Sequence, residues 1–394
     1  MLWCMQFSQP SSARIINRLR VLNLVAQSED SSRADVARLL GLNKVSTSEI
    51  VDGLIADGLV CETGKRTTAA GRRPTGLILE KDVRAVIAVD VGMKNTSVTL
   101  SNLLGEPLRF ERFPTARKPL PEEMCATIIR SANKILTHMK NPAMVMGMAV
   151  AINGTVEPAT GSVLGVTDWQ WENVPLSVAL SRHLPFPVLV ENNVKAMVLG
   201  EHWFGHGDTS QSLFYINWGE HIGAAWVSGG RILSNDCQFG HLPIARTGLC
   251  RCGAIGCLET VASGWALVDQ ALAHTQQSDT TVKQLCAKSD SDAGIDALLK
   301  RACEGMVSAL ISAAAILRPD RILIGGGISA LPERYMDLIT HSFAQRAPLR
   351  ISAITKVERT ALGDRAGMMG TAALALDEFF YKRTLLEQLR QQNL

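Results

Sequence analysis

The chain has 394 residues, of which 46% are hydrophobic and 20% are charged, and its formal net charge is +3. This composition is typical of a globular protein with two or three domains and a sizeable core. The apolar runs are too short to span a bilayer, and the N-terminus has neither the basic nor the apolar region of a signal peptide. Nine cysteines that look unpaired indicate a reducing cytoplasm.

The first eighty residues predict three helices. Apolar residues recur every three or four positions from 12 to 27, which predicts the first helix. Ser32-Arg-Ala-Asp35 is a capping box that begins a second helix, and Gly41 ends it. Asn43 can cap a third, in the order of a helix-turn-helix motif. The N-terminal end of this third helix turns polar side chains to solvent: Lys44, Ser46, Ser48.

Two short strands, 59–62 and 77–79, follow the third helix and enclose a long loop. This arrangement predicts a winged helix. The loop contains no acid and four basic residues: Lys65, Arg66, Arg72, Arg73. Arginines on a wing suit a narrow, A·T-rich minor groove. Taken alone, each polar surface is equally compatible with simple solvation or with binding to another protein.

The remainder of the chain predicts an α/β fold with two lobes. The segment Ala85 to Gly92 reads as a buried strand that ends in an acid and a glycine, which is how an actin-like or hexokinase-like (ribonuclease H-like) ATPase lobe begins. Strands at 144–151 and 186–191 continue the first sheet, and a second lobe starts near Leu213. We expect an amphipathic helix from 374 to 389 that caps the first lobe.

These patterns give the predicted domain division. It is a DNA-binding winged helix-turn-helix at 1–80, a first lobe at 81–195 completed by 374–394, and a second lobe at 196–373.

Three cysteines and a histidine within seventeen positions predict a metal site: His241, Cys250, Cys252, Cys257. Three thiolates and one imidazole are the donors that tetrahedral zinc takes. Glycines at 253 and 256 allow the backbone to fold tightly around the ion. Since four protein ligands leave no position for water, the zinc should be structural. A disulfide framework is a poor alternative, because cysteines 250 and 252 are too close to pair comfortably.

The spacing His-(x8)-Cys-x-Cys-x4-Cys-Leu-Glu, which follows Phe-Gly, resembles the signature of the ROK family of sugar kinases and sugar-responsive repressors. Gly71-Arg-Arg-Pro74 is similar to the Gly-Arg-Pro wing of the repressors. The resemblance covers nearly the whole chain, including the N-terminal domain that distinguishes the repressors from the kinases. It therefore implies that the N-terminal domain binds double-stranded DNA with these residues: Lys44, Ser46, Ser48, Arg66, Arg72, Arg73.

Four positions differ from the pattern of the family's kinases. The first phosphate loop contains Met93 and Lys94, and the second contains Trp218 and Glu220, which should hinder phosphate binding by bulk and repulsion. The family's catalytic aspartate is replaced by Asn193, and an amide is no base at neutral pH. The glutamate of the family's Glu-x-Gly-His motif becomes Gln238. We therefore predict that the chain is not an enzyme.

The cleft that the resemblance implies still suits a sugar or sugar phosphate. Amides, an imidazole and a carboxylate can donate to and accept from vicinal hydroxyls, and the expected contacts are Asn192, Asn193, Gln238, His241 and Glu259. By resemblance, His241 both contacts the sugar and holds zinc. Trp169 and Trp171 lie in the family's sugar-site loop, although core packing is the more common role for each.

The sequence thus predicts a cytoplasmic, zinc-containing repressor that forms a homodimer or tetramer, since a palindromic operator mirrors a two-fold protein. Two alternatives remain open. The chain could be an active ROK sugar kinase that carries a DNA-binding domain. It could also be a regulator that a protein partner, such as a sugar-transport component, sequesters.

Overall fold

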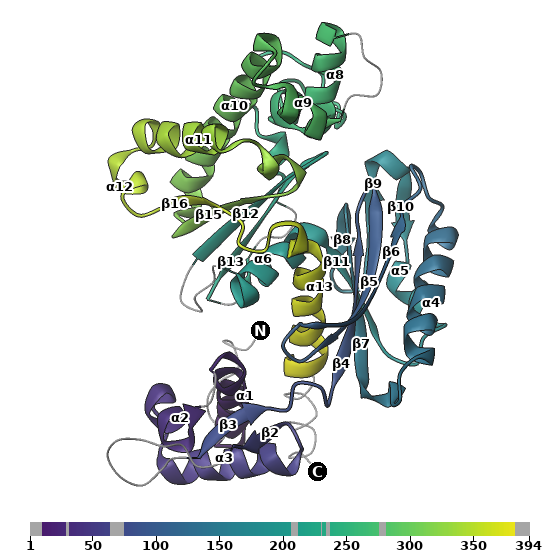
Figure 1. Ribbon diagram of the computed structural model, residues 1–394, viewed down its shortest axis with the longest axis vertical. Coiled ribbons are helices and arrows are strands. Elements are labelled where there is room, and N and C mark those ends of the chain that lie inside the picture. The colour runs from purple at the N-terminus through teal and green to yellow at the C-terminus, as the bar shows by residue number, and fades with distance from the viewer. Residues whose placement is uncertain are drawn as a thin grey trace.

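The computed structural model describes residues 10–28, 31–63, 75–205, 212–229, 231–233, 237–275 and 281–382. It has an N-terminal helical domain and two α/β lobes (Figure 1). In the N-terminal domain, a three-stranded sheet of order β1-β3-β2 packs with three helices. The elements are α1 (Pro10–Gln27), β1 (Ser31–Ser32), α2 (Arg33–Leu40), α3 (Lys44–Ala56), β2 (Val60–Glu62) and β3 (Gly76–Leu79).

Caps confirm the predicted starts of α2 and α3 and the predicted end of α2, whereas α1 begins at Pro10, two residues before the predicted start. Ser32 and Asp35 form both hydrogen bonds of the capping box, and Gly41 closes α2 in the left-handed conformation at φ 65°. The Asn43 side chain accepts from the backbone N–H of Ser46 at 2.7 Å. Three of the wing residues predicted to contact DNA lie outside the described residues: Arg66, Arg72, Arg73.

The first lobe is built on a five-stranded sheet of order β11-β7-β4-β5-β6. Its strands are β4 (Ala85–Val91), β5 (Asn95–Asn102), β6 (Pro107–Pro114), β7 (Val145–Ile152) and β11 (Val188–Asn192). A small second sheet contains β8 (Thr155–Glu157), β9 (Ser162–Val166) and β10 (Trp171–Val174). The helical segments are α4 (Pro121–Thr137), η1 (Pro142–Met144), η2 (Thr167–Trp169) and α5 (Leu176–Ser181).

The second lobe repeats this plan with a sheet of order β14-β13-β12-β15-β16. Its strands are β12 (Ser212–Trp218), β13 (Ile222–Ser228), β14 (Arg231–Ile232), β15 (Arg321–Gly325) and β16 (Lys356–Arg359). Its helices are η3 (Phe239–His241), α7 (Glu259–Ala262), α8 (Gly264–Thr275), α9 (Val282–Lys288), α10 (Ala293–Leu317), η4 (Gly327–Ala330), α11 (Glu333–Arg346), α12 (Leu349–Ser352) and η5 (Gly363–Arg365).

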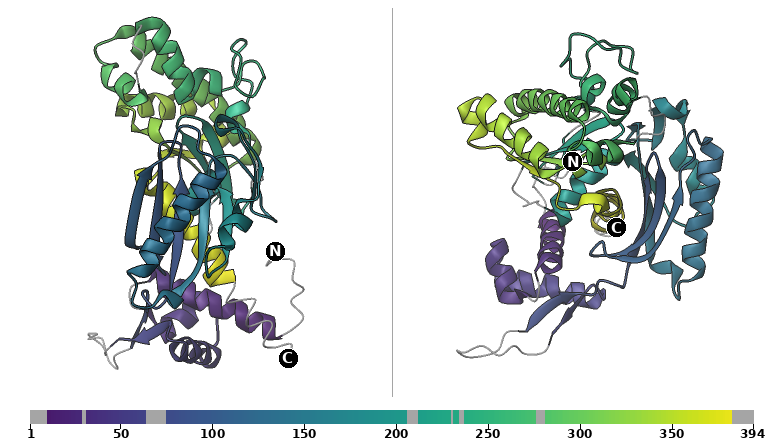
Figure 2. Two further views of the ribbon diagram at one scale, coloured as in Figure 1. Left: turned by 90° about the vertical axis from the view of Figure 1, so that its right-hand side faces the viewer. Right: turned by 45° about the horizontal axis from the view of Figure 1, so that its top comes forward.

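Two helices, α6 (Asn193–Phe204) and α13 (Ala366–Leu376), cross each other beside the two sheets (Figures 1 and 2). The C-terminal helix begins at Ala366, earlier than predicted, and continues as the π-helix η6 (Asp377–Lys382). Its described part is not amphipathic, because nearly every side chain of α13 is buried. The aromatic residues of η6 join a hydrophobic cluster that includes the core of the N-terminal domain. Within the described ranges, no helix is long and apolar enough to cross a membrane.

Candidate functional site

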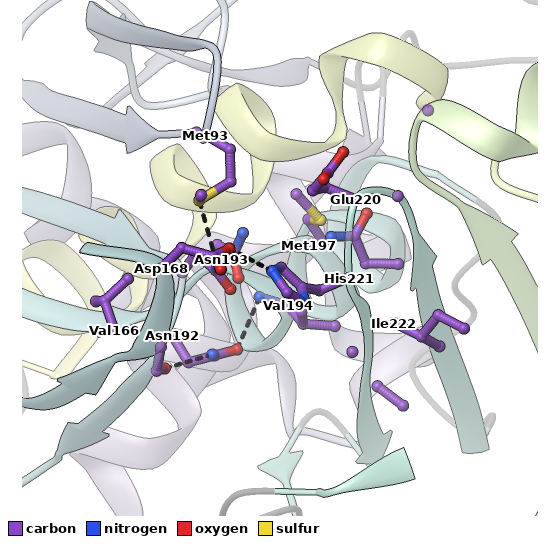
Figure 3. Close-up of a pocket in the computed structure, with 18 of the residues that line it drawn as sticks. Met93, Val166, Asp168, Asn192, Asn193, Val194, Met197, Glu220, His221 and Ile222 are labelled. Carbon is purple, nitrogen blue, oxygen red and sulfur yellow. Dashed lines mark hydrogen bonds and ion pairs between the residues drawn. The ribbon is translucent and has the colours of Figure 1, made fainter. Parts of the chain in front are cut away.

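A cavity of about 740 Å³ lies between the two lobes. The first lobe contributes the residues after β4, β7 and β11, and the second lobe contributes the turn between β12 and β13 (Figure 3). The five residues predicted to contact a sugar all line this cavity: Asn192, Asn193, Gln238, His241, Glu259. The structure therefore brings together residues that are up to 67 positions apart, since the set runs from 192 to 259.

Asn192 is largely occupied by the protein itself. Its Oδ1 atom accepts from the backbone N–H groups of Val194 (2.8 Å) and Lys195 (3.3 Å), which caps α6. Its Nδ2 atom donates to the backbone carbonyl of Gly154 at 2.8 Å. One N–H therefore remains for a ligand, because the two lone pairs of the oxygen are both used. This cap also occupies the helix N-terminus, which would otherwise be available to an anion.

Asn193, at the position that the resemblance predicts for the catalytic acid of the kinases, is only 7% exposed. Its Oδ1 atom is buried and has no hydrogen-bond partner. A buried polar atom without a partner costs free energy on the order of 1–3 kcal/mol, unless a ligand or water satisfies it. Since the residue lines the cavity, a ligand hydroxyl is a suitable donor to this atom.

The two segments predicted to correspond to the kinases' phosphate loops contribute residues to the cavity wall. Met93 and Lys94 line it from the first lobe, and Glu220 lines it from the second. Met93 accepts a weak hydrogen bond from Asn153 at 3.4 Å. The expectation that the Trp218 indole blocks this site is wrong, because Trp218 is fully buried and donates to the carbonyl of Ala262 instead.

The two tryptophans of the predicted sugar-site loop are core residues. Trp169 is 4% exposed and Trp171 is 3% exposed, and their ring centroids lie 5.2 Å apart. The indole of Trp171 donates to the backbone carbonyl of Pro119 at 2.8 Å. Neither ring lines the cavity. Their contribution is to fix the loop η2 that connects β9 to β10.

That loop presents Asp168, which the sequence patterns did not single out. Its Oδ2 atom lies 2.5 Å from Nε2 of His221 on the second lobe, and the two side chains face each other in Figure 3. The other ring nitrogen of His221 lies 3.3 Å from Glu259. A signal was present in the sequence, since His221 stands in the segment predicted as the second phosphate loop, but its partner on another lobe could not be inferred.

Glu259 is held by three protein donors. Its Oε1 atom accepts from the backbone N–H of Ile222 at 2.5 Å, and its Oε2 atom accepts from the indole of Trp265 at 2.6 Å. With His221 as a third neighbour and 4% side-chain exposure, this carboxylate has a mainly structural role.

The charges around His221 favour its protonated form. Burial opposes the charge on the ring, but the hydrogen bonds to Asp168 and Glu259 and their negative charges outweigh it, and they raise the pKa of His221 to about 9. The hydrogen bond to His221 correspondingly lowers the pKa of Asp168, against the effect of burial. At neutral pH, therefore, an imidazolium lies between two carboxylates at the wall of the cavity.

The predicted metal ligands converge on one point. The ligand atoms of His241, Cys250, Cys252 and Cys257 all lie within 4.8 Å of one another. The Cys252 and Cys257 sulfurs are 3.8 Å apart, and the Cys250 sulfur is 3.6 Å from Nδ1 of His241. Tetrahedral zinc, with bonds of about 2.3 Å to sulfur and about 2.0–2.1 Å to nitrogen, requires separations of about 3.8 and 3.6 Å. The donor set and its spacing therefore fit zinc.

The tight folding of the metal loop depends on Gly256. Its φ is 79°, and a Cβ atom at this position would lie 1.9 Å from the carbonyl oxygen of Ala245. The Gly256 carbonyl accepts from the backbone N–H groups of Ile244 and Ala245, both at 2.8 Å. Glycine is therefore required here for conformation and for space. These hydrogen bonds join the two ends of the loop.

On the N-terminal domain, the first turn of α3 is accessible. Lys44 is exposed, Ser46 and Ser48 are half-buried, and Thr47 is buried beneath them. Arg33 pairs with Asp52 at 2.7 Å and with Glu62 at 2.9 Å, which fastens α2 to α3 and to β2. Arg33 is therefore committed to holding the domain together, and the polar end of α3 is presented on a fixed support.

The architecture defines a two-lobed α/β protein with a kinase-type cleft and an added winged helix. The model of the ROK family matches residues 86–378, and the chain belongs to the ROK family. It is 28% identical over 384 residues to a xylose repressor from Caldicellulosiruptor bescii, covering 92% of this chain and 96% of that protein. It is 24% identical over 393 residues to the DNA-binding transcriptional dual regulator NagC of Escherichia coli, covering 96% of this chain and 95% of NagC.

The solved structure of a ROK family transcriptional regulator, described as a homologue of the E. coli MLC protein, has the same fold. The TM-score is 0.80 at 24% identity, and the alignment covers 96% of this chain and 99% of the other. The ROK family also contains kinases. Membership alone therefore does not decide between a regulator and an enzyme.

Proposed function

We propose that this protein is a DNA-binding transcriptional regulator, a repressor of carbohydrate-uptake or catabolism genes that responds to a sugar or sugar phosphate. The main support is that a winged helix and a cleft with Asn193 at the predicted position of the catalytic acid occur in the same chain. This chain also aligns with a xylose repressor over 92% of its length. The buried, unpartnered Oδ1 atom of Asn193 supports a hydroxyl-bearing ligand in that cleft.

For DNA, the contacts proposed on α3 are Lys44, Ser46 and Ser48, and the wing would add Arg66, Arg72 and Arg73 at flanks rich in A·T. Serine hydroxyls and a lysine near the N-terminal end of a recognition helix suit base edges and phosphates of the major groove. The protein would act in the cytoplasm as a homodimer or tetramer, because a two-fold operator requires two such helices.

The four clustered ligands would hold structural zinc. When bound, the ion supplies a rigid centre for the loop from 241 to 257, from which α7 and Glu259 start. No position is left for a reacting water, so the ion would take no part in chemistry. His241 is one of the four ligands and Glu259 follows the last ligand by two positions, and both residues also line the cavity.

A thermal-shift screen of the zinc-loaded protein tests the sugar assignment. Monosaccharides and their 6-phosphates would be added with and without ATP, since a ligand that binds only the native state raises Tm. Stabilisation by one sugar and none by ATP supports the proposal. A separate coupled assay measures ATP consumption, and turnover with any sugar would instead favour the alternative, a sugar kinase with a DNA-binding domain.

DNA binding is tested by selection of bound fragments from genomic DNA, followed by titration of the selected fragment with and without the stabilising sugar. A sugar-dependent change in affinity is expected. Binding of DNA without any sugar response would favour the second alternative, in which a sequestering protein such as a sugar-transport component controls the regulator.

A further inference from the structure

Asp168 is held rigidly by the first lobe. It lies in the three-residue turn η2, next to Trp169 and near Trp171, which both belong to the hydrophobic core of this lobe. Gln170 and Asn173, which follow in the chain, adopt positive φ values of 58° and 50°. Such backbone conformations are uncommon for residues other than glycine and persist where the surrounding structure fixes them. The backbone beside Asp168 is thus fixed by its own lobe.

Both partners of Asp168 belong to the second lobe. Oδ2 meets Nε2 of His221 at 2.5 Å, and Oδ1 meets a guanidinium nitrogen of Arg251 at 3.3 Å. His221 lies in the turn between β12 and β13, and Arg251 lies between the metal ligands Cys250 and Cys252. The two bonds therefore span the cleft, and one of them ends on the metal loop itself.

The two cationic partners are themselves fixed. Arg251 lies over the ring of Trp265, with 4.6 Å from its central carbon to the ring centroid. His221 is held on its other side by Glu259, whose carboxylate also accepts from Trp265. A continuous network thus leaves the metal loop at Arg251, crosses to Asp168, returns to His221 and ends at Glu259, two positions after the last ligand. Charge-assisted bonds of this kind are roughly twice as strong as neutral ones.

We propose that Asp168 is the positioning residue of an inter-lobe clamp, which closes the cleft over its ligand by binding His221 and Arg251. The inference deepens the proposed function, on which its ligand rests, and it concerns the same cavity, since Asp168 and His221 both line it. The clamp couples closure to the metal loop, because Arg251 keeps its position only while that loop is folded. Asp168 itself is not expected to bind the metal.

Hydrogen exchange followed by mass spectrometry tests the clamp in the zinc-loaded, sugar-free full chain, so the test is independent of the sugar. Asp168→Asn should speed exchange of the backbone amides at 219–222, on the other lobe, by about tenfold, the factor expected for loss of one charged hydrogen bond. His221→Gln should have the same effect at 166–171. The double variant should be no faster than the faster single variant.

The matched control is Glu172→Gln, which neutralises an exposed carboxylate on β10 and should leave both segments unchanged. Asp168→Glu keeps the negative charge and should restore part of the protection of amides 219–222. This partial recovery would show that the faster exchange in Asp168→Asn is not caused by misfolding. Zinc content should stay the same in all variants. Exchange that changes only in the mutated segment, or additively in the double variant, would overturn the clamp.

This experiment separates the two proposals. Cross-lobe coupling in a protein that responds to no sugar would retain the clamp and remove the proposed function. A protein that responds to a sugar but shows no cross-lobe coupling would retain the proposed function and remove the clamp. Where both hold, Asp168→Asn should weaken binding of the sugar identified by thermal shift about tenfold, because an open cleft no longer encloses it.

Discussion

Gly200 on α6 and Gly370 on α13 meet where the two helices cross, and a Cβ atom on Gly200 would lie 2.7 Å from the Cα of Gly370. A Cβ on Gly370 would lie 2.3 Å from the carbonyl oxygen of Ala196. The absence of side chains allows the backbones to touch. Since α6 begins at the cavity with Asn193, the crossing ties the ligand site to the C-terminal helix.

We predict that Gly370→Ala destabilises the protein by about 1–3 kcal/mol, because the methyl group overlaps the backbone of α6 and neither helix can move without repacking. Chemical denaturation measures the change. Gly165→Ala is the control, since its Cβ would meet only the carbonyl of Trp171 at an ordinary 3.9 Å. Equal effects of the two substitutions would show that the crossing is not tightly packed.

Asn193→Asp is predicted not to restore sugar phosphorylation. The substitution supplies a carboxylate, but Met93 and Glu220 still line the cavity where the resemblance predicts small phosphate-binding residues. A coupled assay of ATP consumption with a sugar panel should give no turnover above the background, while a known glucokinase in parallel shows that the assay works. Turnover would mean that Asn193 alone separates this protein from a kinase.

Removal of the metal is predicted to loosen the loop from 241 to 257. Purified protein should contain about one zinc per chain by elemental analysis, and Cys257→Ser or His241→Ala should lose it together with DNA binding. Cys61→Ser, which changes a cysteine of the N-terminal domain outside the cluster, should keep the metal. A His241→Ala protein with full metal content would remove the link between cavity and metal loop.

The pH dependence of stability should reveal His221. Its pKa is raised to about 9, above the ordinary 6.5, so its protonated form stabilises the fold fully below about pH 6.5, and this contribution is lost as pH rises through 9. The surrounding charged groups are Asp168, Glu259 and the adjacent Glu220, with Arg251 behind Asp168.

Wild-type protein should therefore lose more Tm between pH 6.5 and 10 than His221→Gln does, since titrations common to both cancel in the comparison. Proton NMR of the eight histidines should show one ring with a high titration midpoint that disappears in this variant. In Asp168→Asn the midpoint should fall by about one unit or more, because an opposite charge is lost. An unshifted midpoint would place the carboxylate away from the ring.

Lys44→Ala is predicted to weaken DNA binding nearly uniformly across sequences and to reduce the salt slope by about one, as expected for the loss of one phosphate contact. Fluorescence anisotropy at several salt concentrations measures both quantities. Lys118→Ala, an exposed lysine of the first lobe, is the control and should change neither. A change confined to one operator position would instead identify Lys44 as a reader of bases.

Local chemistry in the sequence determined several features of this protein. The Ser32 capping box, the Asn43 cap and the left-handed Gly41 follow from backbone groups within a few residues, so the helices of the N-terminal domain were predictable. The metal cluster was predictable for the same reason, because three of its ligands fall within eight positions and glycines permit their convergence. The prediction that Asn193 cannot act as a base required only the residue type.

Only the tertiary structure decided where the other polar groups are directed. It buried Trp169, Trp171 and Trp218 away from the cavity, because removing their large apolar rings from water is favourable. It also joined Asp168 to His221, which are 53 positions apart and on different lobes. Such a pairing depends on the packing of whole sheets and helices, and residue type and spacing along the chain do not contain it.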